Sequence, residues 1–210
     1  MSDRRVIVDR RRTYRPDRTV VLLVGESAPA GGTHYYLANS RLFHAIREAA
    51  RRVYGRRVPE GEDFLTFAQG RGIWLVDLAA QPVNDLDDDA RRSIVGRGIP
   101  RIAKVIADCA PAFVVAIGTT YVAGPAAQAL ERSKVEAELA ELAELPFPTA
   151  WHREEFVEGL ARVLRRARRR NQASERSRFS RGLISRFFDP LCFPEWDPRT
   201  SRVTYRLYRR

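Results

Sequence analysis

The sequence has little cysteine, little lysine and no long apolar run, and each shortage narrows what the chain can be. Only Cys109 and Cys192 occur among its 210 residues. Two cysteines are too few for a disulfide framework or for a four-cysteine zinc or iron–sulfur site. We therefore expect a reducing, cytoplasmic setting and neither a metal nor an organic cofactor.

No apolar segment approaches the roughly 20 residues that a membrane-spanning helix needs. The N-terminal segment MSDRRVIVDRRR is charged and lacks the apolar centre of a secretory signal. The sequence therefore predicts an intracellular protein without a membrane partner. We expect it to be a monomer.

Lysine is nearly absent, yet the chain is strongly basic. Of its 37 basic residues, only Lys104 and Lys134 are lysine, and the net charge is +11 with a pI near 10.5. A GC-rich genome explains the choice of arginine but not the net excess of positive charge. That excess favours a polyanionic partner, with DNA or RNA ahead of an anionic membrane. Arginine also suits bidentate contacts with phosphate.

Alternating apolar runs and helical patterns predict the fold. Residues 19–24, 73–78 and 113–117 have the composition of buried strands, and the alanine-rich residues 126–144 have helical composition with room for one short strand. This alternation predicts an α/β fold, a three-layer α/β/α sandwich around a central, mainly parallel sheet. The loops after the strands should converge at one edge.

Three segments follow from composition: a basic N-terminal arm (1–18), an α/β/α domain (19–170) and a C-terminal extension (171–210). In the arm, only residues 6–8 could pair, as an edge strand. Helices are expected from Asn39 or Ser40 to Gly55, from the acidic run at 85–89, and along the apolar stripe of residues 156–167. A polar hinge, NQASERS, precedes an aromatic tail that we expect to pack on the domain or on a partner.

The loop after the first strand, GESAPAGGTHYY, carries chemistry that suits a ligand. Its glycines and alanines let the backbone approach a ligand closely at the carboxyl end of the strand. Glu26 and Ser27 supply an acid and a hydroxyl, and His34, Tyr35 and Tyr36 a possible proton donor and flat rings. Such a loop suits a flipped-out base better than a metabolite. Asp77, at the end of the second strand, points toward the same edge as catalytic support or as a cap.

Two motifs resemble the uracil-DNA glycosylase superfamily, and most closely its mismatch-specific thymine/uracil branch. GESAPAGGTHYYLANSRLF (25–43) is similar to the branch's Gly-x-Asn-Pro-Gly loop and the helix start after it. LPFPTAWH (145–152) is similar to its Leu-Pro-Asn-Pro-Ser-Gly-Leu-Asn loop, and GIWLVDLAAQP lies between them where the family has a strand. The resemblance covers residues 19–169. The chain departs from it at Ser27, where the branch has asparagine, and at Phe147, which replaces a polar residue.

The resemblance implies a role for each matching residue. Tyr35 would stack on the extruded base, with Tyr36 as the alternative, and Glu26 or Ser27 would position the attacking water. Thr149 would bind a phosphate, and Trp151 would fill the gap left by the flipped nucleotide. We further expect His34 or His152 to donate a proton to the departing base. The arginines expected to hold phosphates are Arg153, Arg165, Arg166 and Arg169.

Structural roles compete with each of these assignments. Glu26 could simply shape its loop, Tyr35 and Tyr36 could be packing residues, and Trp151 could be a hydrophobic staple before a helix. GESAPAGG has neither the spacing nor the lysine of a nucleotide-binding glycine loop, and Ser27 lacks the flanking glycine of an esterase elbow. The sequence thus predicts a monofunctional DNA glycosylase that flips a damaged, mismatched or modified base. The alternative is a catalytically silent relative that binds DNA or a modified base.

Overall fold

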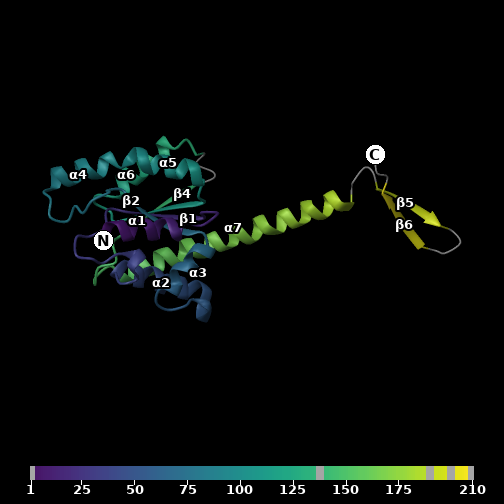
Figure 1. Ribbon diagram of the computed structural model, residues 1–210, viewed down its shortest axis with the longest axis horizontal. Coiled ribbons are helices and arrows are strands. Elements are labelled where there is room, and N and C mark those ends of the chain that lie inside the picture. Colours follow the sequence, from purple (N-terminus) through teal and green to yellow (C-terminus); the bar gives the residue numbers. More distant parts are fainter. Residues whose placement is uncertain (1–2, 136–139, 188–191, 198–201, 208–210) are drawn as a thin grey trace. The chain divides into compact units, whose positions relative to one another are not determined.

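A four-stranded parallel sheet lies at the centre of the computed structural model, which describes residues 3–135, 140–187, 192–197 and 202–207 (Figure 1). The strand order is β2-β1-β3-β4. All residues of β1, β2 and β3 are buried, as expected for strands covered on both faces. The predicted α/β/α sandwich is confirmed. The strands are β1 (Val21–Gly25), β2 (Ile73–Asp77), β3 (Phe113–Ile117) and β4 (Glu141–Leu145).

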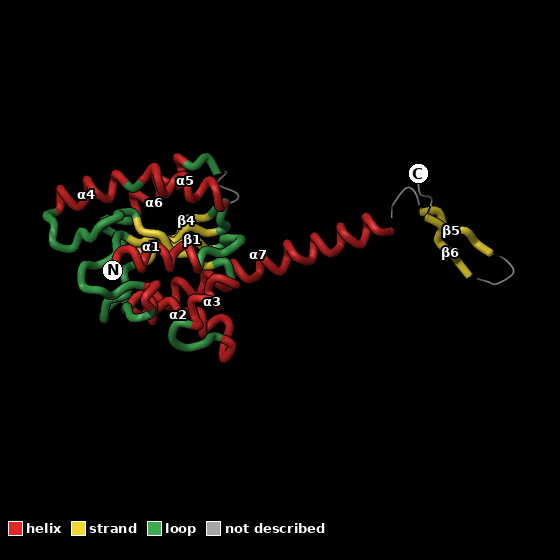
Figure 2. The backbone as a smooth tube through the Cα atoms, in the orientation of Figure 1, coloured by secondary structure: helices red, strands yellow, loops and turns green. Residues whose placement is uncertain are grey.

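Helices form the two outer layers (Figure 2). One face carries α4 (Asp88–Arg97), α5 (Ile99–Cys109) and α6 (Ala123–Arg132). The other carries α2 (Arg41–Tyr54), α3 (Asp63–Gly70) and the first part of α7 (Arg153–Phe187). Short 3₁₀ turns, η1 (Tyr35–Leu37) and η2 (Gly55–Arg57), flank α2. Helix α3 was not predicted.

The order of the strands determines where a ligand can bind. The chain leaves β1 for α2 on one face and leaves β3, its neighbour, for α6 on the opposite face. The two connections therefore diverge and open a crevice at the carboxyl ends of β1 and β3, the usual ligand position in open α/β sheets. Gly25 and Asp77 are paired at this same edge.

Several predicted helix boundaries are confirmed. The Ser40 hydroxyl accepts the Phe43 N–H at 3.1 Å, and Gly55 ends α2 with a φ of +65°. Asp87 caps α4 by accepting the Ala90 N–H at 2.8 Å. The apolar stripe of residues 156–167 is buried against the sheet. The short strand anticipated in the alanine-rich segment is β4.

The N-terminal arm forms a helix, α1 (Asp3–Thr13), so the edge strand expected at residues 6–8 is wrong. Ile7 is buried while Val8 is exposed, and the Trp74 side chain of β2 donates to the Arg11 carbonyl at 3.3 Å. A helix satisfies its own backbone hydrogen bonds and still buries Ile7, which a lone three-residue strand would do less well. Helix α1 thus contacts β2, an edge strand of the sheet.

The chain divides into two compact units, Met1–Ala167 and Arg168–Arg210. The second unit contains the rest of α7 and an antiparallel hairpin of β5 (Cys192–Asp197) and β6 (Arg202–Leu207). Helix α7 continues through NQASERS, so the expected hinge there is wrong, because the segment has no glycine or proline to end a helix. The packing of the tail stays a prediction. Among the described residues, no helix is both long and apolar enough to span a bilayer.

Candidate functional site

A cleft of about 1030 Å³ opens at the carboxyl edge of the sheet. Loops after β1, β2, β3 and β4 all contribute to its lining. The two motifs behind the family resemblance, residues 25–43 and 145–152, therefore meet at one site although they are far apart in the sequence. The cleft brings together most of the predicted catalytic and base-binding residues, and one predicted phosphate-binding residue, Thr149. The catalytic and base-binding residues that line it are Glu26, Ser27, His34, Tyr35, Asp77 and His152.

The Glu26 carboxylate is held by an arginine that the sequence analysis did not select. Arg91, on α4, donates from Nε and Nη2 to the two oxygens of Glu26, the second at 2.7 Å. The hydrogen bond to Glu26 raises the pKa of Arg91, so the guanidinium keeps its charge. Glu26 thus lies in the cleft as an ion-paired carboxylate with a fixed orientation.

Tyr121, in the loop after β3, extends this network. The Arg91 Cζ lies 4.0 Å from the centre of the Tyr121 ring, and the Tyr121 hydroxyl donates to Asp88 Oδ1 at 2.5 Å. Glu26, Arg91 and Tyr121 all line the cleft and come from three different elements. No motif joins them in the sequence, and only the polar composition of the loop after β3 indicated a site there.

Asp77 is buried at the base of the cleft and has two charged or polar partners. Arg11 of α1 donates to its Oδ2 at 2.7 Å, and Nε2 of His34 lies 3.4 Å from the same oxygen. Burial by itself would raise the pKa of Asp77, but the hydrogen bond with His34 and the positive charges of Arg11 and Arg101 outweigh it and lower the pKa. A Cβ on Gly25 would lie 2.7 Å from Oδ1, so this glycine leaves room for the carboxylate.

His34 is engaged on both ring nitrogens. Its Nδ1 accepts the Tyr36 N–H at 3.2 Å, so the proton lies on Nε2, which faces Asp77. The expectation that His34 donates to a departing base therefore does not fit its contacts. His34 instead fixes the loop after β1 against the end of β2.

The two tyrosines of that loop pack in the core. Tyr35 and Tyr36 are 3% and 1% exposed, and burial raises the pKa of both phenols. The Tyr36 hydroxyl donates to the Leu75 carbonyl at 2.8 Å and accepts the Leu75 N–H at 3.1 Å. Tyr36 does not reach the cleft, and Tyr35 has little exposed surface for a base to cover. Their expected stacking role is therefore replaced by packing between helix α2 and the sheet.

The loop between β4 and α7 is the exposed rim of the cleft. Phe147 lines the cleft and is 46% exposed, and Trp151 is 92% exposed. The exposure of Trp151 rules out the alternative role of a hydrophobic staple. Thr149 accepts the His152 N–H at 3.4 Å near the start of α7, and His152 Nδ1 lies 3.3 Å from Glu155 Oε2. Both line the cleft, and the exposed His152 remains accessible from solvent.

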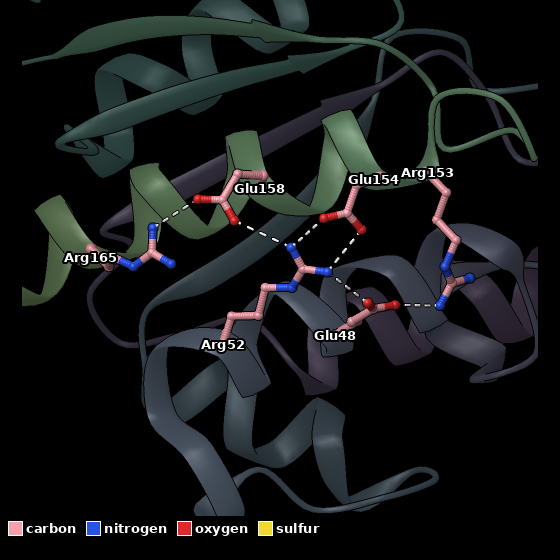
Figure 3. A network of polar contacts seen from close by, with 6 residues as sticks. All are labelled: Glu48, Arg52, Arg153, Glu154, Glu158 and Arg165. Atoms are coloured by element: carbon pink, nitrogen blue, oxygen red, sulfur yellow. Dashed lines mark hydrogen bonds and ion pairs between the residues drawn. The ribbon is translucent and has the colours of Figure 1, made fainter.

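A second groove, of about 740 Å³, lies along α2 and meets the cleft at Arg41, which lines both. Arg52 joins its two walls by donating to Glu154 of α7 at 2.7 and 2.9 Å (Figure 3). Arg51 Nη1 lies 3.7 Å from Glu60 Oε1, and Arg41 forms no ion pair with any described residue. The groove is lined by Arg41, His44, Arg47, Glu48, Arg51, Arg52 and Arg153.

The four arginines that the sequence predicts to contact phosphates differ in whether they pair with a carboxylate of the chain itself. Arg153 pairs with Glu48 beside the groove (Figure 3). Arg165 donates to Glu158 at 3.2 Å, and Arg166 binds both oxygens of Glu141. Arg169 is exposed. Intramolecular carboxylates thus offset much of the charge that the sequence assigned to phosphate binding on α7.

Within the described ranges, no group of three or more His, Cys, Asp or Glu side chains is placed to hold a metal ion. No family model and no curated protein matches the chain.

Proposed function

We propose that the chain is a DNA glycosylase that hydrolyses the N-glycosidic bond of a base flipped out of DNA. The observation that carries this proposal is a cleft that contains a fixed carboxylate and is lined by the exposed Phe147, with the exposed Trp151 in the same loop. Two large aromatic side chains exposed in one loop are available for contact with a partner. A base entering the cleft while Trp151 fills its place in the stack would use both features.

The chemistry requires one water and no further reactant. The water oxygen bonds to C1′ of the sugar as the C1′–N bond breaks, and the electron pair of that bond leaves with the base. A water proton ends on the base nitrogen, so the products are the free base and an abasic sugar. Glu26 would orient the water and face the positive charge that develops on the sugar. His152, accessible on the cleft wall, would donate toward the base.

The first test uses duplex oligonucleotides carrying uracil, mismatched thymine, hypoxanthine, hydroxymethylcytosine or glucosylated cytosine, incubated with chelator and then with hot alkali. Strand cleavage at one base would support the enzyme and identify its substrate. Glu26→Gln should keep DNA affinity and lose base release by about 100-fold or more. Glu62→Gln, a change of the same kind at an exposed glutamate that pairs with Arg10 away from the groove, is the control and should leave both unchanged.

One contact favours the silent alternative. Both oxygens of Glu26 are bound by Arg91, and Ser27 stands where the similar branch has asparagine. A protein that binds the whole panel with strong salt dependence but cleaves none of it would be a base-binding relative rather than an enzyme.

The groove along α2 supports a polyanionic partner in either case. We expect Arg41 and Arg51 to contact backbone phosphates, since they are its least engaged arginines. Changing both to alanine should make the negative slope of log affinity against log salt shallower by about 2, because each arginine is expected to contact one phosphate. The matched double change at Arg97 and Lys104, on the opposite helical layer, should leave the slope unaltered. Equal slopes for the two double variants would contradict a phosphate track in this groove.

A further inference from the structure

The cleft contains a rigid flat surface outside the two family-like motifs. The Arg91 guanidinium is fixed in two ways: its edge binds both oxygens of Glu26, and one face lies over the Tyr121 ring with Cζ 4.0 Å from the ring centre. The Tyr121 ring is itself anchored through its hydroxyl to Asp88. A guanidinium held by a carboxylate and backed by an aromatic ring keeps its plane with little loss of conformational freedom on binding.

The opposite face of this guanidinium has no aromatic partner among the described residues. Arg91 lines the cleft, and a quarter of its side chain is exposed. Its Nη1 donates no hydrogen bond within the described chain, whereas Nε and Nη2 are both used. The surface therefore offers a flat face that matches a planar ring, and a free N–H donor group at its edge.

We propose that Arg91, backed by Tyr121, is the surface on which the extruded base stacks. The inference rests on the proposed function. It fills the role left empty by Tyr35 and Tyr36, which are buried in the core. Nucleobases stack on guanidinium planes and on aromatic rings alike. The same guanidinium then positions Glu26, so base binding and carboxylate orientation share one side chain.

The test measures what the base itself contributes to affinity. Two duplexes are compared, one with a 2′-fluoroarabino nucleotide, which resists glycosidic cleavage, and one with an abasic analogue at the same position. The base is taken in turn from the panel above, and the base giving the largest difference is used for the variants. Arg91→Lys keeps the charge and loses the plane, Tyr121→Leu removes the backing ring, and Tyr121→Phe keeps it. Arg97→Lys, exposed on the same helix, is the control.

The wild-type chain should bind at least one base-containing duplex about tenfold more tightly than the abasic duplex. That difference should disappear in Arg91→Lys and Tyr121→Leu and persist in Tyr121→Phe and Arg97→Lys. A difference unchanged in both of the first two variants, or absent in the wild type for every base, overturns the proposal. If the difference in affinity between the base-containing and the abasic duplex depends on Arg91 but no base is ever released, the stacking surface stands and the proposed catalysis fails. If bases are released and Arg91→Lys keeps the difference, only the stacking surface fails.

Discussion

The contact between Arg11 and Asp77 links the N-terminal helix to the base of the cleft, and its removal has a predictable cost. Asp77 is 5% exposed in its side chain and Arg11 19%, with 2.7 Å between Nη2 and Oδ2. Arg11→Met keeps most of the apolar stem and deletes the charge. Among the residues that the structure describes, the carboxylate then retains only His34, at 3.4 Å, as a side-chain hydrogen-bond partner. Removing one partner from a buried ion pair destabilises a protein by about 3 kcal/mol, and we expect a loss of this order.

The loss should depend on pH in a definite direction. The pKa of Asp77 is lowered in the folded chain, so its ionised form stabilises the fold above the unfolded pKa of about 3.9. This stabilisation is lost as pH falls through the lowered folded pKa. Arg11→Met removes one of the charges that lower the pKa. The difference in stability between wild type and variant should therefore be largest near neutral pH and shrink below about pH 4.

Urea unfolding followed by circular dichroism across a pH series measures both effects. Arg12→Met is the matched control, because Arg12 lies next in the same helix and is exposed. It should change the free energy of unfolding by less than about 0.5 kcal/mol. Equal effects of Arg11→Met and Arg12→Met at neutral pH, or a difference that grows in acid, would refute the role assigned to the Arg11–Asp77 pair.

Two further changes have clear expected outcomes. A Cβ on Gly98 would collide with the Leu78 carbonyl oxygen, so Gly98→Ala should destabilise by about 3 kcal/mol or more in thermal unfolding, whereas Gly96→Ala, with open space around it, should be neutral or slightly stabilising. Trp151→Ala should slow base release about tenfold or more without lowering the melting temperature, because the side chain is almost fully exposed. Leu86→Ala, another exposed apolar change, should affect neither the rate nor the melting temperature. An unchanged rate of release in Trp151→Ala would contradict the role of Trp151 in filling the place of the flipped base.

The sheet and most helix ends were predictable because their causes are local. Buried strands appear as short apolar runs. Ser40 and Asp87 cap the starts of helices, and Gly55 ends one, by contacts within a few residues. The N-terminal helix was not predictable in the same way. Its apolar run is short enough to fit either a strand or a helix, and the residues it contacts, Trp74 and Asp77, lie more than fifty residues away in the chain. Non-local contacts of this kind leave no periodic pattern.

The candidate site was predictable as a place but less so in its details. Motifs at the ends of strands located the cleft, since the carboxyl ends of parallel strands meet at one edge. Whether a loop tyrosine faces a ligand or the core depends on which helix covers the loop. Tyr36 lies on the core side, where its hydroxyl is bound by the backbone of β2. Sequence position alone could not distinguish these two orientations.

The departures from the similar family indicate where substrate choice should be sought. Ser27 and the buried tyrosines lie in the loop after β1, whereas Arg91 and Tyr121 reach the same cleft from α4 and the loop after β3. Glu26 is oriented by Arg91 rather than by a neighbour in its own motif. Under the proposed function, a base larger than uracil would meet small residues on the β1 side and a fixed guanidinium on the α4 side. Exchanging residues within the first motif should change the rate of release, and changes on α4 should alter which base is bound.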